Sequence, residues 1–491
     1  MRDIWESRTS FVLASIGSAI GLGNIWRFPY VCYANGGGAF LIPYLIALLT
    51  AGIPLMILEF SLGHKISRPA PAALSSIKKG FEVLGWFALL IGFGIVTYYA
   101  VVMGWCFNYL GFSFNLAWGQ DTQSFFFNQF LKLSESPLQI GGIQWMIVIG
   151  LVLTWICVVA SIWRGPKTVG KVVYFTVTIP WIILIVLVIR GITLPGAIEG
   201  LKFYLTPKFS ALLDYRVWLA AYSQVFFSLT VGFGVQITYA SFLPKKADVV
   251  NNAFLVSFAN NATSFVGGFA VFSTLGYYAY QTGLPVSEVV KSGPHLAFVT
   301  YPTIISLLPF AASIFGILFF LMLLTLGIDS AFSLVEAGAA SLIDKFKLKR
   351  VHVNIGFGII ALIAGLIYTT RSGLYWLDIV DHFMNNYGLL VVGLLQCIAI
   401  GYFYNTREMR EYANNKSDFT IGAWWDYCIK YLTPIVVAAL LIINIIDRLK
   451  APYGADFDPP YTRTMEFLGG WLVLIIFIIV AVMLYKKRGR E

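Results

Sequence analysis

Apolar residues fill twelve long stretches of this chain, and polar residues collect between them. A helix needs about 20 apolar residues to cross the roughly 30 Å hydrocarbon core of a bilayer. Segments that meet this need lie near residues 10–34, 38–62, 84–112, 143–163, 172–190, 217–242, 250–278, 310–340, 353–369, 376–404, 430–446 and 466–485. The pattern predicts an all-α membrane protein with 12 transmembrane helices that form a single polytopic domain, because the segments leave no room for a soluble catalytic domain.

The first and sixth apolar segments are both interrupted by glycine-rich sequence. The first reads GSAIGLGNIWRFPY at residues 17–30, with Arg27 as its only charge, and the sixth reads FSLTVGFG at residues 227–234. In hydrocarbon every backbone N–H and C=O needs a partner, so unwound backbone at bilayer depth lies only against protein or a watery cavity. The two breaks therefore predict a binding site near the middle of the membrane.

The positions of the two breaks also indicate an internal repeat. Segments one and six are equivalent if segments one to five and six to ten form an inverted repeat. Paired glycine-interrupted segments point to inverted-repeat transporters, in which half-helix N-termini face an anionic group and exposed carbonyls hold cations. We place repeat one at about 9–190, repeat two at about 216–404 and the last two segments at about 427–486. The alternative is that these glycines are helix-packing positions, as small residues often are in membranes.

Charge is sparse, and its placement predicts the orientation of the chain. Charged residues make up 12% of the sequence and hydrophobic residues 58%. Basic residues lie before the first segment and in alternate loops, around residues 64–79, 164–171, 245–246, 345–350 and 486–490. The positive-inside rule makes that side cytoplasmic, with both termini inside, and the same residues attract anionic membrane lipid headgroups. The net charge of +10 therefore reflects topology, and we expect no nucleic-acid partner.

Several carboxylates and amides lie inside apolar segments. Asp329 ends a long uncharged run, and a carboxylate there costs roughly 3 kcal/mol on insertion scales. Its partner is a sodium ion or a buried lysine; we favour the cation, because Arg27 is the only basic residue in the apolar body of the central segments. For Glu59 and Glu336, protonation, proton relay and bracing of unwound backbone are open, and we favour bracing. The polar run at residues 260–264 fits a ligand site or interhelical hydrogen bonding.

Two other classes of membrane protein fit the sequence less well. A channel repeats its selectivity filter around an axis, whereas unlike residues from different segments converge once in this chain. A membrane enzyme needs a nucleophile with a base or a set of metal ligands, and no His or Cys cluster offers one, so we expect no enzyme. The long outer loop at about 113–142 lacks an Asn-X-Ser/Thr acceptor, which favours a prokaryotic plasma membrane.

Five motifs give the chain a family resemblance. They are GSAIGLGNIWRFPY, the pair Tyr98-Tyr99, FFSLTVGFG, NNATSFVGGF and LGIDS. Together they resemble the neurotransmitter:sodium symporter family, which includes the bacterial leucine transporter, over nearly the whole chain. The resemblance implies an inverted repeat of spans 1–5 and 6–10 with spans 1 and 6 unwound. It also implies sodium-coupled import of a small molecule by alternating access.

The resemblance implies two sodium sites. The first would use the Ala19 carbonyl, the substrate carboxylate and the side chains of Asn24, Ser228 and Asn260. The second would use carbonyls of Gly17, Ile20 and Leu326 with the side chains of Asp329 and Ser330. Because the substrate completes the first ion's shell, each favours binding of the other, and the coupling is reciprocal.

The resemblance also implies a substrate site in which Leu22-Gly23 N–H groups and the Tyr99 hydroxyl hold a carboxylate. Its lining residues would be Ser18, Ala19, Gly21, Leu22, Gly23, Ile95, Tyr99, Phe227, Ser228, Thr230, Phe233, Ser330 and Leu334. Monoamine carriers of the family have an aspartate where this chain has Gly21, so an amino acid is favoured over an amine. The apolar residues favour an aliphatic or aromatic one, and such pockets separate neighbours by only about 1–3 kcal/mol per methylene. The alternatives are a small substrate such as glycine, alanine or taurine, or a non-transporting receptor of the same fold.

Gate residues follow from the same resemblance. Arg27 and Asp381 match the outer ion pair, with Tyr99 and Phe233 as the aromatic lid beneath it. Asp378, one helical turn from Asp381, is the competing partner. The inner gate would consist of Arg2 and Asp344, with Trp5 beside Arg2.

A departure from many bacterial members concerns chloride. Those members carry a carboxylate on span seven where this chain has Ser264. Without that fixed negative charge, two sodium ions would leave the region strongly positive in a low dielectric. We therefore predict that a chloride ion binds between Tyr44, Gln224, Ser228 and Ser264.

Overall fold

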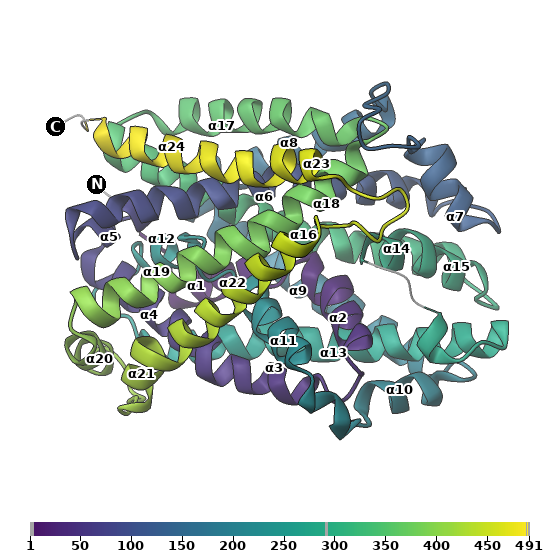
Figure 1. Ribbon diagram of the computed structural model, residues 1–491, viewed down its shortest axis with the longest axis horizontal. Coiled ribbons are helices and arrows are strands. Elements are labelled where there is room, and N and C mark those ends of the chain that lie inside the picture. Colours follow the sequence, from purple (N-terminus) through teal and green to yellow (C-terminus); the bar gives the residue numbers. More distant parts are fainter. Residues whose placement is uncertain (1–3, 290–292, 488, 490–491) are drawn as a thin grey trace.

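The computed structural model describes residues 4–289, 293–487 and 489, and these are helical almost throughout (Figure 1). In that part of the chain, β structure is limited to two isolated bridges, Gly37 with Pro207 and Ile143 with Thr370. Both chain ends lie toward the same end of the molecule in Figure 1, as an even number of membrane crossings requires. The protein is an all-α membrane protein.

Nine helices among the described residues are long and apolar enough to cross a bilayer. They are Leu41–Ile66 (α3 and α4), Lys79–Phe112 (including α6), Pro166–Ile192 (α9), Val250–Thr282 (α13), Ala312–Phe346 (α16), Arg350–Thr369 (including α17), Gly373–Phe403 (including α18 and α19), Trp424–Lys450 (α21 and α22) and Arg463–Lys486 (α23 and α24). A tenth is the bent pair Arg8–Ala19 (α1) and Gly23–Ala34 (ending in α2, Phe28–Ala34), which turns by 49°. Short helices connect these spans: Ala70–Ser75 (α5), Thr122–Ser124 (α7), Ala197–Leu205 (α10), Gly293–His295 (α14), Tyr301–Ser306 (α15) and Thr406–Asn414 (α20).

The remaining two of the twelve predicted segments are helical but fail a length test. Trp145–Ser161 (α8) has 17 residues, a little short of a full crossing at 1.5 Å per residue. The sixth segment is divided into Tyr215–Ser228 (α11) and Val235–Ala240 (α12). A length criterion therefore counts fewer spans than the hydropathy pattern does.

Burial separates a central group of helices from a peripheral one. The most apolar stretch of α6 is 89% buried, whereas those of α9 and of Arg463–Lys486 are only 28% and 22% buried. All three are apolar around their whole circumference, so sequence hydrophobicity does not distinguish core from lipid-facing helices. The first broken helix packs through α1 against α9, α13 and α16, and the second packs through α11 and α12 against α3, α4 and α16, which places the breaks inside protein.

The break in the sixth segment has a local cause. In the sixth segment Gly232 and Gly234 have φ values of +86° and +73°, and Thr230 has +53°. Left-handed backbone costs glycine little but other residues more, so the helix stops at Ser228 and restarts at Val235. Glu59 Oε1 accepts the N–H of Gly232 at 2.8 Å, which is the bracing role that we favoured for this carboxylate.

Glu336, the other intramembrane glutamate, has a cationic partner that the sequence did not indicate. Arg350 Nη1 donates to its two carboxylate oxygens at 2.7 and 2.8 Å. The Glu336 side chain is only 1% exposed, and that of Arg350 is 18% exposed. A basic residue from the start of α17 therefore reaches a buried carboxylate of α16.

Candidate functional site

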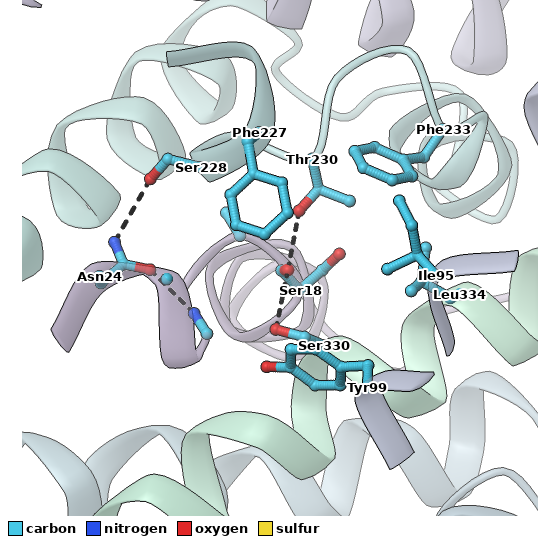
Figure 2. Close-up of a pocket in the computed structure, with 13 residues that line it drawn as sticks. Ser18, Asn24, Ile95, Tyr99, Phe227, Ser228, Thr230, Phe233, Ser330 and Leu334 are labelled. Atoms are coloured by element: carbon cyan, nitrogen blue, oxygen red, sulfur yellow. Dashed lines mark hydrogen bonds between the residues drawn. The ribbon is translucent and has the colours of Figure 1, made fainter. Parts of the chain in front are cut away.

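A cavity of about 40 Å³ lies where the two broken helices meet (Figure 2). Its lining residues are Ser18, Ala19, Gly21, Gly23, Asn24, Ile95, Tyr99, Phe227, Ser228, Thr230, Phe233, Ser330 and Leu334. This set contains every predicted substrate contact except Leu22, and it adds Asn24. Leu22 is fully buried and directs only its backbone toward the site.

Hydrogen bonds hold the unwound backbone of the first segment in place. Gly21 N–H donates to Asn24 Oδ1 at 2.9 Å, and Leu22 N–H donates to the Tyr99 hydroxyl at 3.2 Å. The Thr230 hydroxyl donates to the Ser18 carbonyl at 2.9 Å, which joins the two breaks directly (Figure 2). The polar groups released by unwinding are thus satisfied by neighbours rather than by water.

Close packing explains why glycine stands at position 21. A Cβ added there would lie 2.6 Å from Ser330 Oγ and 3.0 Å from the Tyr99 hydroxyl. A side chain at this position would therefore displace two groups that line the cavity. The site has no carboxylate at this point of the first segment.

Oxygen atoms gather at one end of the cavity, around Asn24. Its Nδ2 donates to Asn260 Oδ1 at 2.9 Å and to Ser264 Oγ at 2.8 Å, and it lies 3.4 Å from Ser228 Oγ. In the other orientation of the Asn260 amide, the bond from Asn24 to Asn260 is lost and the Asn260 nitrogen instead donates to the Ala19 carbonyl at 3.1 Å, so Ala19 also adjoins the cluster. The four residues predicted for the first sodium site are thus mutual neighbours.

The second predicted sodium site contains a buried carboxylate. Asp329 is 1% exposed, and its Oδ1 has no hydrogen-bond partner among the described residues. A Cβ on Gly17 would lie 2.6 Å from Asp329 Oδ2, so this oxygen rests against the end of α1. The Ser330 hydroxyl donates to the Ile20 carbonyl at 3.4 Å, and Leu326 is buried one turn earlier on α16.

The chemistry of these ligands limits which ion they suit. No group of three or more His, Cys, Asp or Glu side chains is arranged so that it could hold a metal ion in the part of the chain that the structure describes. Carbonyls, hydroxyls, amides and one carboxylate remain, and such oxygen sets suit hard cations rather than transition metals. The donor set of the second site, one carboxylate with neutral oxygens, fits a monovalent cation.

Apolar side chains form the other end of the cavity. Figure 2 shows Phe233 beside Ile95 and Leu334, away from Asn24 and Ser228. Phe233 is therefore not the lid beneath Arg27, and that part of our prediction is wrong. The ring of Phe227 takes this place, 4.3 Å from the Arg27 guanidinium carbon.

The lid was misassigned because both aromatic residues fit the sequence pattern. Phe227 lies in the last turn of α11, whereas Phe233 lies within the unwound stretch between α11 and α12. A Cβ on Gly23 would meet the Phe227 ring at 2.7 Å, so glycine at that position lets the ring pack against the first break. The direction of each ring depends on the geometry of the break, which the sequence does not contain.

Of the two carboxylates predicted as partners of Arg27, Asp381 forms the ion pair. Arg27 Nη1 lies 3.9 Å from Asp381 Oδ2, and the Tyr98 hydroxyl donates to Asp381 Oδ1 at 2.6 Å. The competing carboxylate, Asp378, instead accepts the hydroxyls of Tyr453 and Tyr461 at 3.2 Å each. With side-chain exposures of 22% and 34%, the Arg27–Asp381 pair is worth at most about 1 kcal/mol.

Of the three residues predicted for the inner gate, the structure describes Trp5 and Asp344. Arg2 lies outside the described residues. Trp5 Nε1 donates to the Tyr239 carbonyl at 2.9 Å, and its N–H donates to the Phe242 carbonyl at 3.1 Å. Asp344 pairs with Arg68 at 3.1 Å, a partner that the sequence did not indicate.

Two of the residues predicted to bind chloride have polar side-chain atoms without hydrogen-bond partners among the described residues. The Tyr44 hydroxyl and both polar atoms of the Gln224 side chain have no hydrogen-bond partner within the described ranges. The hydroxyls of Ser228 and Ser264 adjoin Tyr44. Such orphaned groups are uncommon in protein interiors, and their donors would suit a ligand that accepts hydrogen bonds.

Comparison with known proteins identifies a family and several relatives of this chain. A model of the sodium:neurotransmitter symporter family matches residues 2–124 and 120–489. The chain belongs to this family. An uncharacterized sodium-dependent transporter of Methanocaldococcus jannaschii is 44% identical to the symporter over 493 residues, which cover 99% of the chain and 98% of that protein. Sodium- and chloride-dependent GABA transporter 2 of Homo sapiens is 34% identical over 512 residues, covering 96% and 84% respectively.

Family membership makes the protein a sodium-dependent membrane transporter and not an enzyme. The structure also brings into the symporter's site residues that our sequence analysis did not assign. The Ser333 hydroxyl accepts from Ser18 Oγ at 2.9 Å, and Asn385 Nδ2 donates to Asp381 Oδ1 at 2.8 Å. Tyr98 was visible as part of a motif, but only its contact with Asp381 reveals a role.

Proposed function

We propose that this symporter imports a hydrophobic amino acid together with sodium. The observation that carries the proposal is the division of the cavity into a polar end, at Asn24 and Ser228, and an apolar end, at Ile95, Phe233 and Leu334. An amino acid has the same division between its backbone groups and its side chain. Ligand sites typically pair apolar walls with a few oriented polar groups in this way.

The polar end suits a carboxylate. The Tyr99 hydroxyl accepts the Leu22 N–H at 3.2 Å, so it lies at the start of the half-helix beyond the break, where the helix dipole favours negative charge. The site lacks the carboxylate that an amine substrate would require at Gly21. The human relative is named for GABA, which also carries a carboxylate.

Sodium coupling would arise from the two oxygen-rich clusters. A substrate carboxylate placed near Ala19, Asn24 and Asn260 would join the shell of the first ion, so ion and substrate would favour each other's binding. The second ion would neutralise Asp329 and tie α16 to the end of α1. Loss of either ion would leave buried polar groups unpaired, which is costly.

Chloride would complete the charge balance. Tyr44 and Gln224 carry polar atoms without hydrogen-bond partners in the described part of the chain, and Ser264 bonds to Asn24 of the predicted first sodium site. The chain has Ser264, not a carboxylate, at this position of span seven. A chloride ion there would accept hydrogen bonds from these groups and offset one sodium charge. The human relative is described as chloride-dependent.

Transport would proceed by alternating access. Closure of Arg27 onto Asp381, with Phe227 beneath, would cover the outer side of the site, and opening near Trp5 would release substrate inward. An inward-negative potential supplies about 2.3 kcal/mol per charge per 100 mV. This driving force supports uphill uptake across the plasma membrane.

The test begins with a thermal-shift screen of the twenty amino acids with GABA and taurine, in sodium and in potassium. We expect aliphatic or aromatic amino acids to raise the melting temperature only in sodium. The best ligand is then offered to proteoliposomes with an inward sodium gradient, and accumulation above the outside concentration is expected. Stabilisation only by glycine, alanine, GABA or taurine would contradict the substrate class, and binding without accumulation would indicate a receptor.

A further inference from the structure

A second cavity lies between the end of α9 and the helices α13, α15 and α16. It is near the end of the molecule opposite to the chain termini (Figure 1). It has a volume of about 30 Å³. Its wall is formed by Leu187, Arg190, Gly191, Leu194, Ala270, Thr274, Tyr301, Ile304, Ile305, Leu308, Phe315 and Phe319. None of these residues belongs to the site described above.

The wall of this lateral cavity is apolar. Apart from Arg190, its polar side chains are Thr274, whose hydroxyl donates to the Ala270 carbonyl at 2.9 Å, and Tyr301, whose ring stacks on that of Phe319 with centroids 4.1 Å apart. A water molecule needs two to four polar partners to stay in a buried site. The cavity therefore suits a hydrocarbon group rather than water.

Arg190 is the one charged residue of the wall, and it lies in the last turn of α9. Its guanidinium lies 4.8 Å from the Phe310 ring and donates to Thr193 Oγ1 at 3.3 Å. Its Nε is buried without a hydrogen-bond partner, and no ion pair to it occurs among the described residues. A guanidinium held between aromatic rings with a free donor is suited to an anionic oxygen.

The surroundings of Arg190 place the cavity mouth at the lipid. Ile189, Phe310 and Ile314 are 56%, 63% and 59% exposed, and exposed apolar side chains on a membrane protein face acyl chains. Arginine at the end of a membrane helix reaches headgroup level. A ligand with an alkyl chain and an anionic head would place both parts in favourable surroundings.

We propose that the lateral cavity binds the alkyl chain of an anionic amphiphile whose head group pairs with Arg190. The helix dipole offers a simpler role for this arginine, because a cation in the last turn is stabilised by the free carbonyls. That role explains the charge but not the empty apolar cavity beside it. The two accounts differ in whether an anionic chain is preferred to a neutral one.

The test is photolabelling of the purified full-length chain in neutral maltoside micelles with a diazirine derivative of oleate. Cross-linked peptides are mapped by mass spectrometry. We expect labelling of the cavity wall, with unlabelled oleate competing about tenfold better than oleyl alcohol, since a charged hydrogen bond is worth about 1.5–3 kcal/mol. Phosphatidylglycerol is tested as a second competitor. If it competes better than oleate, the bound amphiphile is a phospholipid, and if oleate competes better, it is a free fatty acid.

Three variants separate head-group binding from general lipid contact. Arg190→Gln should remove the preference for oleate over oleyl alcohol, and Ala270→Leu should reduce labelling of the cavity by filling it. Arg216→Gln, at an exposed arginine on α11, is the control and should behave as wild type. Labelling spread over the lipid-facing surface, or a preference for oleate that survives in Arg190→Gln, would overturn the proposal.

Discussion

Replacing Asp329 with asparagine should have two opposite effects on stability. The side chain is 1% exposed, and Oδ1 has no partner within the described part of the chain. Asparagine keeps the shape of the side chain and removes its charge. The sodium-free protein should therefore become more stable, whereas its response to sodium should largely disappear.

The size of each effect follows from the burial of the carboxylate. An unpaired intramembrane carboxylate costs about 3 kcal/mol on insertion scales, so the substitution should stabilise the sodium-free protein by about 1–3 kcal/mol. At a sodium concentration of 100 times Kd, wild type gains about 2.7 kcal/mol from binding. If loss of the carboxylate lowers affinity about 100-fold, the same concentration stabilises the variant by only about 0.4 kcal/mol.

The assay is thermal unfolding of substrate-free protein, with sodium chloride titrated against potassium chloride at constant ionic strength. Omitting substrate limits the contribution of the first sodium site, which the substrate carboxylate completes. Asp456→Asn, at an exposed loop residue, serves as the control and should leave the sodium response unchanged. A full sodium response in Asp329→Asn, or a variant less stable than wild type without sodium, would refute the reasoning.

Three further predictions test other parts of the site. Gly21→Ala should weaken substrate binding, measured as Kd, by about 1–3 kcal/mol because the added methyl group overpacks against Ser330 and Tyr99. Gly111→Ala is the control and should leave Kd unchanged, since a Cβ added there meets no atom within 4 Å. Replacing chloride with gluconate should lower sodium-driven uptake in wild type but not in Ser264→Glu, whose fixed charge replaces the ion; equal loss in both would count against the chloride site. Tyr98→Phe should lower substrate affinity more than Arg27→Gln. The hydrogen bond from Tyr98 to the Asp381 carboxylate is worth about 1.5–3 kcal/mol, and the partly exposed Arg27–Asp381 ion pair is worth less. The reverse order of Kd values would contradict this reasoning.

The fold and most of the site could be predicted from the sequence because their signals are local. Helix formation follows from apolar runs, and the breaks follow from glycines that take left-handed φ at positions 232 and 234. The breaks predicted a site near the middle of the membrane, and the family resemblance of the motifs indicated which residues line the cavity. Only Leu22 among the predicted contacts points elsewhere, since its side chain is fully buried.

Partner choice was less predictable. Asp378 and Asp381 are one turn apart with similar surroundings in sequence, yet one accepts two tyrosine hydroxyls and the other faces Arg27. Phe227 comes just before the unwound stretch and Phe233 lies within it, and only the path of the backbone between them sets which ring lies beneath Arg27. Asp344 likewise meets Arg68, a residue far from it in the chain.

The sequence by itself determined that this is a membrane protein, where its helices run and where two of them break, because hydropathy and backbone freedom are properties of short stretches. It also determined the family, because the motifs at the breaks are long. The tertiary structure decided which carboxylate meets which cation, which ring covers the cavity and where a second cavity opens beside Arg190. These outcomes depend on the packing of distant segments, and differences of a few ångströms in that packing change the partner.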